Sequence, residues 1–535
     1  IEGTAIYAGK KTEVVLVEQS MANLASNNAR QIYSQVAGLN IYQNDDAGLQ
    51  LNIGGRGLDP NRTANFNTRQ NGYDISADVL GYPESYYSPA AEALKEIQII
   101  RGAASLQYGT QFGGLVNFII KSPNPNKSFE FITRNTIGNN SLYTNFTSIS
   151  GTKNKWSYYS FFNYKKGDGF RPNSKFESKN IYAHIGYQIK SDTKISGEIT
   201  YLNYLAQQAG GLTDQMFNSN PFQSNRARNW FQVDWLLYNL KFEHKFSENT
   251  NFTFNAFGLN ASRYSLGFRT NRVDQIDPLA ERDLIKGDFN NFGFETRILN
   301  KYELFNKKAT ILLGSKYYKA DNTGQQGPGS EGTDPNFDFQ SEEYPNYGNQ
   351  SNYTYPNLNI AVFGENILYL NDKLSITPGF RFEYIKTESK GFYKNINTDS
   401  AGNVILNETI DNSEVRKRSF ALLGLGIGYK PVDALEIYGN ISQNYRSVTF
   451  SDISIINPAF SISPSISDEK GFTTDLGLRG NYKNIVSYDV GVFGLFYKNR
   501  IGFIQKAFPD GSVKTVRGNV GDAVMYGLES LIDFN

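Results

Sequence analysis

Arginine is the side chain whose placement in this sequence most suggests binding chemistry. Its guanidinium group presents a planar fork of N–H donors that matches the two oxygens of a carboxylate. Two Arg-Gly pairs, Arg56-Gly57 and Arg101-Gly102, each follow a short apolar run. A polar stretch between Ser262 and Lys286 holds four more arginines, namely Arg263, Arg269, Arg272 and Arg282. This pattern is typical of a site for an anion that carries carboxylates.

A second basic cluster lies in the stretch NRARNWF, where Arg226 and Arg228 precede Trp230. Aspartates partly offset the positive charge of the Ser262 to Lys286 stretch; they are Asp274, Asp277 and Asp283. Mixed charge of this kind is also typical of a solvated loop. For each arginine, a ligand contact and a solvated loop charge therefore both stay open.

Catalytic and metal-binding patterns are absent from the sequence. Its two histidines, His184 and His244, both fall on segments that we predict to be strands. No HExxH, EF-hand or CxxC spacing occurs, and the chain has no cysteine. The carboxylate pairs Asp45-Asp46 and Glu342-Glu343 stand alone, and we expect them to be solvated. The sequence predicts no enzyme, no resident metal and no cofactor.

Composition narrows the class of protein further. The 535 residues include 53 basic and 52 acidic side chains, and this balance gives no electrostatic case for nucleic acid. Aromatic residues are 14% of the chain, yet no run of about eighteen apolar residues could form a transmembrane helix. No signal peptide precedes Ile1, so we expect a mature or trimmed chain.

From Phe129 onward the chain alternates apolar and polar residues in segments of about ten or more. One apolar face is formed by Leu374, Ile376, Phe380, Phe382 and Tyr384. Short turns, such as Asn371 to Lys373, join some segments, and long polar stretches join others; these are Asp321 to Tyr353 and Asn395 to Val415. We predict an all-β transmembrane barrel with about sixteen strands present.

The stretch from Leu51 to Lys121 follows a different pattern. Short apolar runs are broken by glycine pairs, which indicates short strands with tight turns. Ser20 to Val36 has helical spacing and predicts a short helix, so the N-terminal region is a mixed α/β domain. The proline-containing stretch SPNPNKS marks its end. We expect one domain over residues 1–127 and the barrel over residues 128–535.

The segments GRGLDPNR and IQIIRGAASLQYGTQFGGLVNFI resemble the plug domain of TonB-dependent outer-membrane transporters, and within that family the ferric-citrate receptor group. The resemblance implies a plug inside the lumen of a barrel of about 22 strands in the bacterial outer membrane, in contact with its lipids. The family's barrels continue past a motif like MYGLESLIDF, here Met525 to Phe534. We therefore expect the C-terminal strands of the barrel to lie beyond Asn535.

The resemblance also implies roles for particular residues. In the family, two plug arginines pair with acidic groups of the barrel wall and seat the plug. Here they are Arg56 and Arg101, with Asp475 and Glu529 as the wall positions; the family usually has Glu where this chain has Asp475. Gln111 matches a ligand-facing glutamine, and Asn65 stands where the ferric-citrate receptors carry an arginine. Further ligand contacts are expected among Arg62, Arg69, Trp230 and the loop arginines Arg263, Arg269, Arg272 and Arg282.

By resemblance, the chain imports a ferric chelate, with ferric citrate or a similar siderophore first. A periplasmic TonB-type protein would grip the N-terminal segment by adding a strand; a plain first strand of the plug is an equal reading of Ile1 to Gly9. Hydroxamate or catecholate siderophores and cobalamin remain open as cargo. Haem is disfavoured as cargo. Haem importers of this family typically use a histidine on the plug apex or the outer loops, and neither His184 nor His244 lies there. Two other classes also stay open, namely a passive porin and an importer of glycans or peptides that works with a surface lipoprotein.

Overall fold

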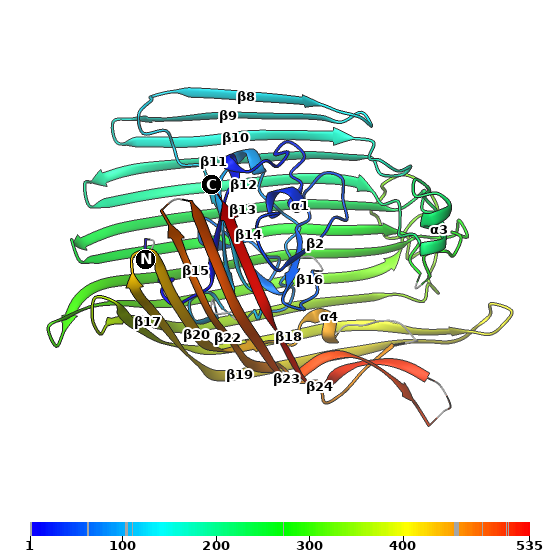
Figure 1. Ribbon diagram of the computed structural model, residues 1–535. Helices are drawn as coiled ribbons and strands as arrows, with labels where there is room; N and C mark the ends of the chain where they lie inside the picture. Colours follow the sequence, from blue (N-terminus) through cyan, green and yellow to red (C-terminus); the bar gives the residue numbers. More distant parts are fainter. Residues whose placement is uncertain are drawn as a thin grey trace.

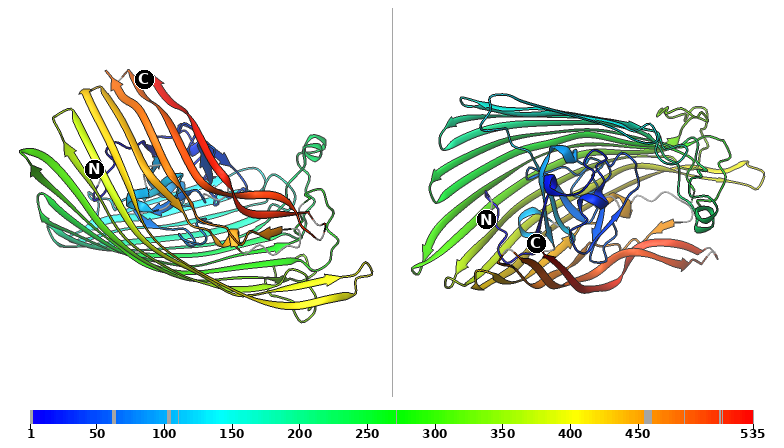
Figure 2. Two further views of the ribbon diagram at one scale, coloured as in Figure 1. Left: turned by 90° about the horizontal axis from the view of Figure 1, so that it is seen from below. Right: turned by 45° about the horizontal axis from the view of Figure 1, so that its top comes forward.

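The computed structural model describes residues 3–60, 64–101, 105–109, 111–270, 272–453, 460–483, 485–509, 511 and 513–534. The chain forms an N-terminal plug and a large sheet of long strands that curves around it (Figures 1 and 2). Arg62, one of the expected ligand contacts, lies outside the described residues.

The plug is built on a five-stranded sheet in the order β1-β6-β7-β4-β5. Its strands are β1 (Thr12–Leu16), β6 (Leu94–Arg101), β7 (Gly114–Ile120), β4 (Phe66–Gln70) and β5 (Tyr73–Asp74). A separate hairpin joins β2 (Leu39–Tyr42) to β3 (Asn52–Gly55). The short helices are α1 (Ala29–Ile32), α2 (Ser105–Tyr108) and the 3-10 turns η1 (Val17–Gln19) and η3 (Ala91–Ala93). The mixed α/β character predicted for this region is confirmed.

The helix predicted over Ser20 to Val36 was too long. The structure has only the single turn α1, which begins after Asn28, whose side chain accepts a hydrogen bond from the Gln31 amide. The apolar runs of β6 and β7 are buried because the sheet packs inside the barrel; Ile97, Ile99 and Val116 are each 0–1% exposed. Burial of these runs inside the plug, beside residues such as Ile32 and Leu51, holds it together without long helices.

The barrel sheet contains seventeen strands, β8 to β24, one of which is the three-residue β21. The expectation of about sixteen strands agrees with this count among the described residues. Their bounds are β8 (Glu130–Ile137), β9 (Tyr143–Lys153), β10 (Trp156–Gly167), β11 (Phe176–Lys190), β12 (Thr193–Gln207), β13 (Trp230–Ser247), β14 (Thr250–Gly267), β15 (Asp283–Leu304), β16 (Lys307–Pro328), β17 (Ser351–Tyr369), β18 (Leu374–Thr398), β19 (Val404–Val432), β20 (Leu435–Arg446), β21 (Phe460–Ile462), β22 (Glu469–Tyr482), β23 (Val486–Ala507) and β24 (Val513–Phe534).

Side chains alternate between the two faces of these strands as predicted. On β12, Ile199 and Tyr201 are 47% and 40% exposed on the outside, whereas Glu198 and Thr200 are buried in the lumen. Apolar side chains outside and polar side chains inside are the arrangement of a sheet whose outer face meets lipid. Among the described residues, no helix is long and apolar enough to cross a membrane.

The two ends of the barrel differ in the length of their connections. At one end, which we call the long-loop end, residues 208–229, 268–282 and 329–350 join successive strands, and α3 (Asp214–Ser219) and α4 (Phe450–Ile453) lie in its loops (Figure 1). At the other, the short-turn end, connections such as 248–249 and 305–306 are only two residues long. The long loop predicted over Asn395 to Val415 is wrong, because antiparallel pairing of β18 with β19 continues to Thr398 and Val404.

Candidate functional site

A large cavity opens at the long-loop end between the plug and the barrel wall. It encloses about 2060 Å³ of empty space that is continuous with solvent. We call it the outer cavity. Its lining combines cations, carboxylates and aromatic rings, among them Arg30, Asp45, Asp46, Tyr86, Arg171, Tyr204, Phe231, Arg263 and Arg269. A concave space with apolar surface and a few convergent polar groups is the expected form of a small-molecule site.

Four arginines line the outer cavity; Arg171 donates to the backbone carbonyls of Gln223 and Gly210, and the other three bring positive charge from the wall and the plug. Arg263, on β14, donates a hydrogen bond to the Tyr82 hydroxyl (2.7 Å), and its guanidinium lies 5.4 Å from the centres of the Tyr82 and Tyr86 rings. Arg269 follows the same strand, with its side chain 44% exposed. Arg30 is exposed on α1 and comes from the plug. The sequence patterns did not single out Arg30, because it stands alone in a polar segment. Together these cations can bind an anionic ligand from both sides.

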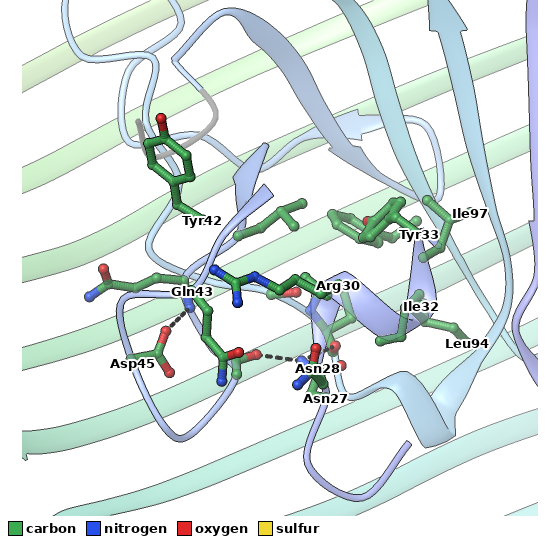
Figure 3. A pocket seen from close by; sticks show the side chains of 17 residues that line it. Asn27, Asn28, Arg30, Ile32, Tyr33, Tyr42, Gln43, Asp45, Leu94 and Ile97 are labelled. Atoms are coloured by element: carbon green, nitrogen blue, oxygen red, sulfur yellow. Dashed lines mark hydrogen bonds between the residues drawn. The ribbon is translucent and has the colours of Figure 1, made fainter. Parts of the chain in front are cut away.

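Figure 3 shows the plug side of this region, where Arg30 reaches from α1 toward Gln43 above a narrow pocket. The pocket shares Arg30, Gln43 and Asp45 with the outer cavity, and Ile32 and Leu94 form part of its apolar lining. The empty space of this pocket is about 490 Å³, much less than that of the outer cavity. Because the two spaces share lining residues, the pocket extends the outer cavity into the plug.

The two aspartates of the outer cavity are partly buried, although they line a space that is continuous with solvent. Asp45 closes a plug loop, because its carboxylate accepts hydrogen bonds from the amides of Leu49 and Gln50, each at 3.1 Å. Burial raises the pKa of Asp46, and the neighbouring charge of Asp45 raises it further, whereas Arg171 acts in the opposite direction. Asp46 thus places a carboxylate with a raised pKa beside the cations.

Three of the residues expected to contact a ligand lie outside the outer cavity, and two of them, Arg282 and Trp230, hold the long loops together. Arg282 is completely buried and donates to the backbone carbonyls of Ser330 (2.8 Å) and Asp334 (2.8 Å). The Trp230 indole donates to the carbonyl of Thr333 (2.7 Å). Arg272 is exposed and paired with Asp274 at 3.0 Å. None of the three lines the outer cavity.

The expected ligand contacts of the plug also lie away from the outer cavity. Arg69 is buried and paired with Glu295 of β15 at 3.2 Å. Gln111 is buried, and its side-chain oxygen is 3.5 Å from the Asn67 amide nitrogen. Asn65 donates to the backbone carbonyl of Asp59 (2.9 Å). The motifs placed these residues in the plug. They did not indicate which plug loop faces the outer cavity.

The expected contacts of Arg56 with the wall are present. Its guanidinium lies 2.6 Å from Asp475 of β22 and 2.9 Å from Glu529 of β24, and all three side chains are buried. The shorter Asp475 side chain therefore reaches. Arg56 has a φ of +56°, an uncommon conformation for a residue with a side chain, and Gly57 follows with +79°. A side chain at Gly57 would also meet the sulfur of Met525 at 2.5 Å.

Arg101 contacts the wall less directly. It donates to the Ala37 carbonyl (2.6 Å) and to Glu13 (3.1 Å), both within the plug, and it lies 3.9 Å from Glu529. The second arginine of the motif pair therefore mainly braces the plug beside Arg56.

Further plug–wall contacts were not predicted. The buried carboxylate of Asp78 accepts hydrogen bonds from the Tyr318 hydroxyl (2.9 Å) and the amides of Asn322 (2.8 Å) and Asn357 (2.5 Å). Asp74 pairs with Lys316 at 2.5 Å. Each pair joins residues more than two hundred positions apart, so no local spacing in the sequence could have revealed them.

The segment before β1 is also tied to the wall, and we call residues 3–11 the N-terminal strap. Lys10 contacts both oxygens of Glu365 on β17, at 2.5 and 2.6 Å. Ile6 is fully buried in an apolar cluster of the wall, and Gln107 of α2 donates to its carbonyl (2.6 Å). The strap is therefore held in the lumen by the ion pair of Lys10 with Glu365, by that of Lys11 with Asp489 and by the buried Ile6.

Comparisons with known proteins identify the family. A family model described as TonB dependent receptor-like, beta-barrel, matches residues 182–535, and the TonB-dependent Receptor Plug Domain model matches residues 9–115. The barrel model spans more than half of the chain, and the chain belongs to the TonB-dependent receptor family. No curated protein sequence matches it significantly.

Solved structures share the fold at low sequence identity. The ferric citrate transporter FecA in its unliganded form is 17% identical, with a TM-score of 0.77 over 98% of this chain and 74% of that chain. The ferric yersiniabactin uptake receptor FyuA from Yersinia pestis is 14% identical, with a TM-score of 0.73 over 98% and 76%. The copper transporter OprC is 14% identical, with a TM-score of 0.70 over 98% and 78%. These likenesses show the fold, while the cargoes named for the three proteins differ.

Replacing Arg56 with Met should loosen the plug, because Asp475 and Glu529 would remain buried without a partner. Breaking such a buried pair costs about 3–5 kcal/mol. We expect hydrogen exchange of plug strands β4 and β7 to accelerate while the barrel strands stay protected. Arg101→Met is the matched control and should have a smaller effect, since its wall contact is longer. Equal exchange in wild type and Arg56→Met would contradict a seating role for Arg56.

Replacing Lys10 with Met should release the N-terminal strap, because Glu365 would lose its buried partner. We expect proteolysis within residues 3–11 to become faster in detergent-solubilised protein. The double variant Lys10→Met, Glu365→Leu removes both charges and should recover much of the protection. If the single variant is as resistant as wild type, the ion pair does not hold the strap.

Proposed function

We propose that this receptor imports an anionic ferric chelate across the bacterial outer membrane, with ferric citrate or a similar carboxylate siderophore as the first candidate. The observation that carries the proposal is the outer cavity, where Arg30 of the plug lies opposite Arg263 and Arg269 of the wall. Membership of the family and the likeness to a ferric citrate transporter support it.

The chemistry of the outer cavity favours a carboxylate chelate over a neutral cargo. Guanidinium groups bind carboxylates through paired N–H donors, and a cleft lined with cations raises the local concentration of anions. Aromatic rings, among them Tyr86 and Phe231, give the ligand apolar contact area. The iron of such a chelate is cargo, and its own ligands are supplied by the chelator.

Import needs the plug to move, because the plug fills the lumen below the outer cavity. In the proposed cycle, residues 1–127 act as the plug and residues 128–535 as the wall whose apolar face contacts outer-membrane lipid. A TonB-type periplasmic partner pulls on the N-terminal segment by using the inner-membrane proton gradient. The strap is suited to this role, since it precedes β1 and is tied to the plug through Gln107.

A binding titration that is monitored through tryptophan fluorescence tests the proposed cargo. Trp235 packs against Tyr86, which lines the outer cavity, so a bound iron chelate should quench its emission. Ferric citrate should bind saturably, and the double variant Arg263→Ala, Arg269→Ala should bind about 100-fold more weakly. Arg272→Ala is the matched control, because Arg272 lies outside the outer cavity, and it should bind like wild type.

Iron-free citrate, a hydroxamate siderophore and cobalamin complete the comparison. If another chelate binds and ferric citrate does not, that chelate replaces ferric citrate as the proposed cargo, and the import role stands. If the double variant binds ferric citrate as well as wild type does, the outer cavity is not the site.

Asp46 should weaken the binding of an anion, and it should do so more strongly as the pH rises. Its pKa is raised, so acidification through that pKa protonates the carboxylate and removes a repulsion that is present when it is ionised. We expect Asp46→Asn to bind the chelate roughly threefold to tenfold more tightly than wild type at about pH 7.

The difference between the two proteins should shrink as the pH falls from about 7 toward the raised pKa of Asp46. Comparing variant and wild type at each pH cancels changes in the speciation of the chelate. A ratio that stays constant across this range would contradict the assignment of Asp46 to the ligand site.

A further inference from the structure

A second large cavity lies in the short-turn half of the lumen, and we call it the inner cavity. It encloses about 1300 Å³ of empty space between the wall, the strap and the plug. Wall residues such as Glu198, Lys241 and Glu243 make its surface polar, and the strap residues Thr4 and Ala5 form one side. A space of this character can hold a hydrated, charged solute.

The inner and outer cavities lie along the same four wall strands, β11 to β14. These neighbouring strands run from one end of the barrel to the other (Figure 1). On β12, Tyr204 lines the outer cavity and Glu198 the inner cavity; on β13 the corresponding pair is Phe231 and Lys241. Part of the plug separates the two spaces along this face.

That part of the plug, which we call the septum, consists of Gln70–Tyr73 and Tyr86–Tyr87. Gln70 donates to the Thr200 hydroxyl (3.1 Å), and Asn71 donates to Glu198 (2.9 Å). Tyr86 packs edge-on against Trp235, with ring centres 6.2 Å apart. The contacts between septum and wall are thus single hydrogen bonds and ring packing.

The ionic contacts of the plug go elsewhere. Among the described residues, every ion pair between the plug or strap and the wall involves β8, β15–β17 or β22–β24. These pairs are Glu92–Arg134, Arg69–Glu295, Asp74–Lys316, Lys10–Glu365, Arg56–Asp475, Lys11–Asp489, Arg56–Glu529 and Arg101–Glu529. Separating a buried ion pair leaves unpaired charges, whereas separating hydrogen-bonded groups into a hydrated space costs less. The β11–β14 side of the plug is therefore held without ion pairs among the described residues, through hydrogen bonds and a buried apolar cluster that includes Leu202 and Trp235.

We propose that the cargo crosses between the septum and strands β11–β14, while the opposite side of the plug stays docked through its ion pairs. This route rests on the proposed import function. Displacement of the septum joins the outer cavity to the inner cavity, and displacement of the strap opens the inner cavity toward the short-turn end. The contacts Gln70–Thr200 and Asn71–Glu198 are then the gate of the route.

Crosslinking tests the route cleanly, because the chain has no cysteine of its own. Gln70→Cys with Thr200→Cys fixes the septum to β12. Leu106→Cys with Gly424→Cys is the matched control and fixes α2 to β19, where a Cβ at position 424 would lie 2.6 Å from the Leu106 side chain. Each pair is bridged with a short bis-methanethiosulfonate reagent, and the bridge is later removed with dithiothreitol.

Binding and energised cellular uptake of ferric citrate are measured before bridging, after bridging and after reduction. The septum bridge should lower uptake about tenfold or more with binding unchanged, and reduction should restore uptake; the control bridge should leave uptake within about twofold. Uptake that persists through the septum bridge, or that is blocked by both bridges, overturns the route. Uptake by the two double-cysteine variants before bridging tests the import function itself. A failure of the import function is therefore distinguished from a failure of the route.

Discussion

Buried charge that must be paired is the constraint on which the docking of the plug depends. Arg56 sits between Asp475 and Glu529 with all three side chains out of water, and Lys10 and Asp74 are paired with Glu365 and Lys316 in the same way. Each partner belongs to a strand of the wall, so the charges are satisfied only when the plug is seated. The plug is therefore specified in position and orientation by the wall, and not by its own small core alone.

The same constraint gives the plug two unequal sides. Ionic contacts concentrate on β15–β17 and β22–β24, whereas β11–β14 meet the plug through hydrogen bonds, one of them to the carboxylate of Glu198, and through apolar packing, and carry a cavity above and below the septum. A receptor must hold its lumen shut without ligand and still let the plug yield under a directed pull. Ionic docking on one side and a side without ion pairs on the other meets both requirements, because only the side without ion pairs has to separate.

Much of the fold could be predicted from the sequence, because period-two alternation and the plug motifs are local patterns. The site could be predicted only in part. Arg263 and Arg269 line the outer cavity, but Arg282 and Trp230 tie loops together, and Gln111 and Arg69 are buried against the wall. Arg30, Asp78 and Lys10 gave no local signal, since their surroundings come from segments distant in the sequence. Long-range packing decides which polar residue faces ligand and which holds the structure.

The central claim is that the outer cavity captures an anionic iron chelate that crosses only when the plug is pulled. Uptake of radioactive iron, supplied as ferric citrate to cells that produce the receptor, measures this most directly. We expect saturable uptake that stops when a protonophore collapses the proton gradient or when the TonB-type partner is deleted, while binding at the cell surface persists. Iron entry that continues without the gradient would contradict the claim and indicate a lumen open to diffusion.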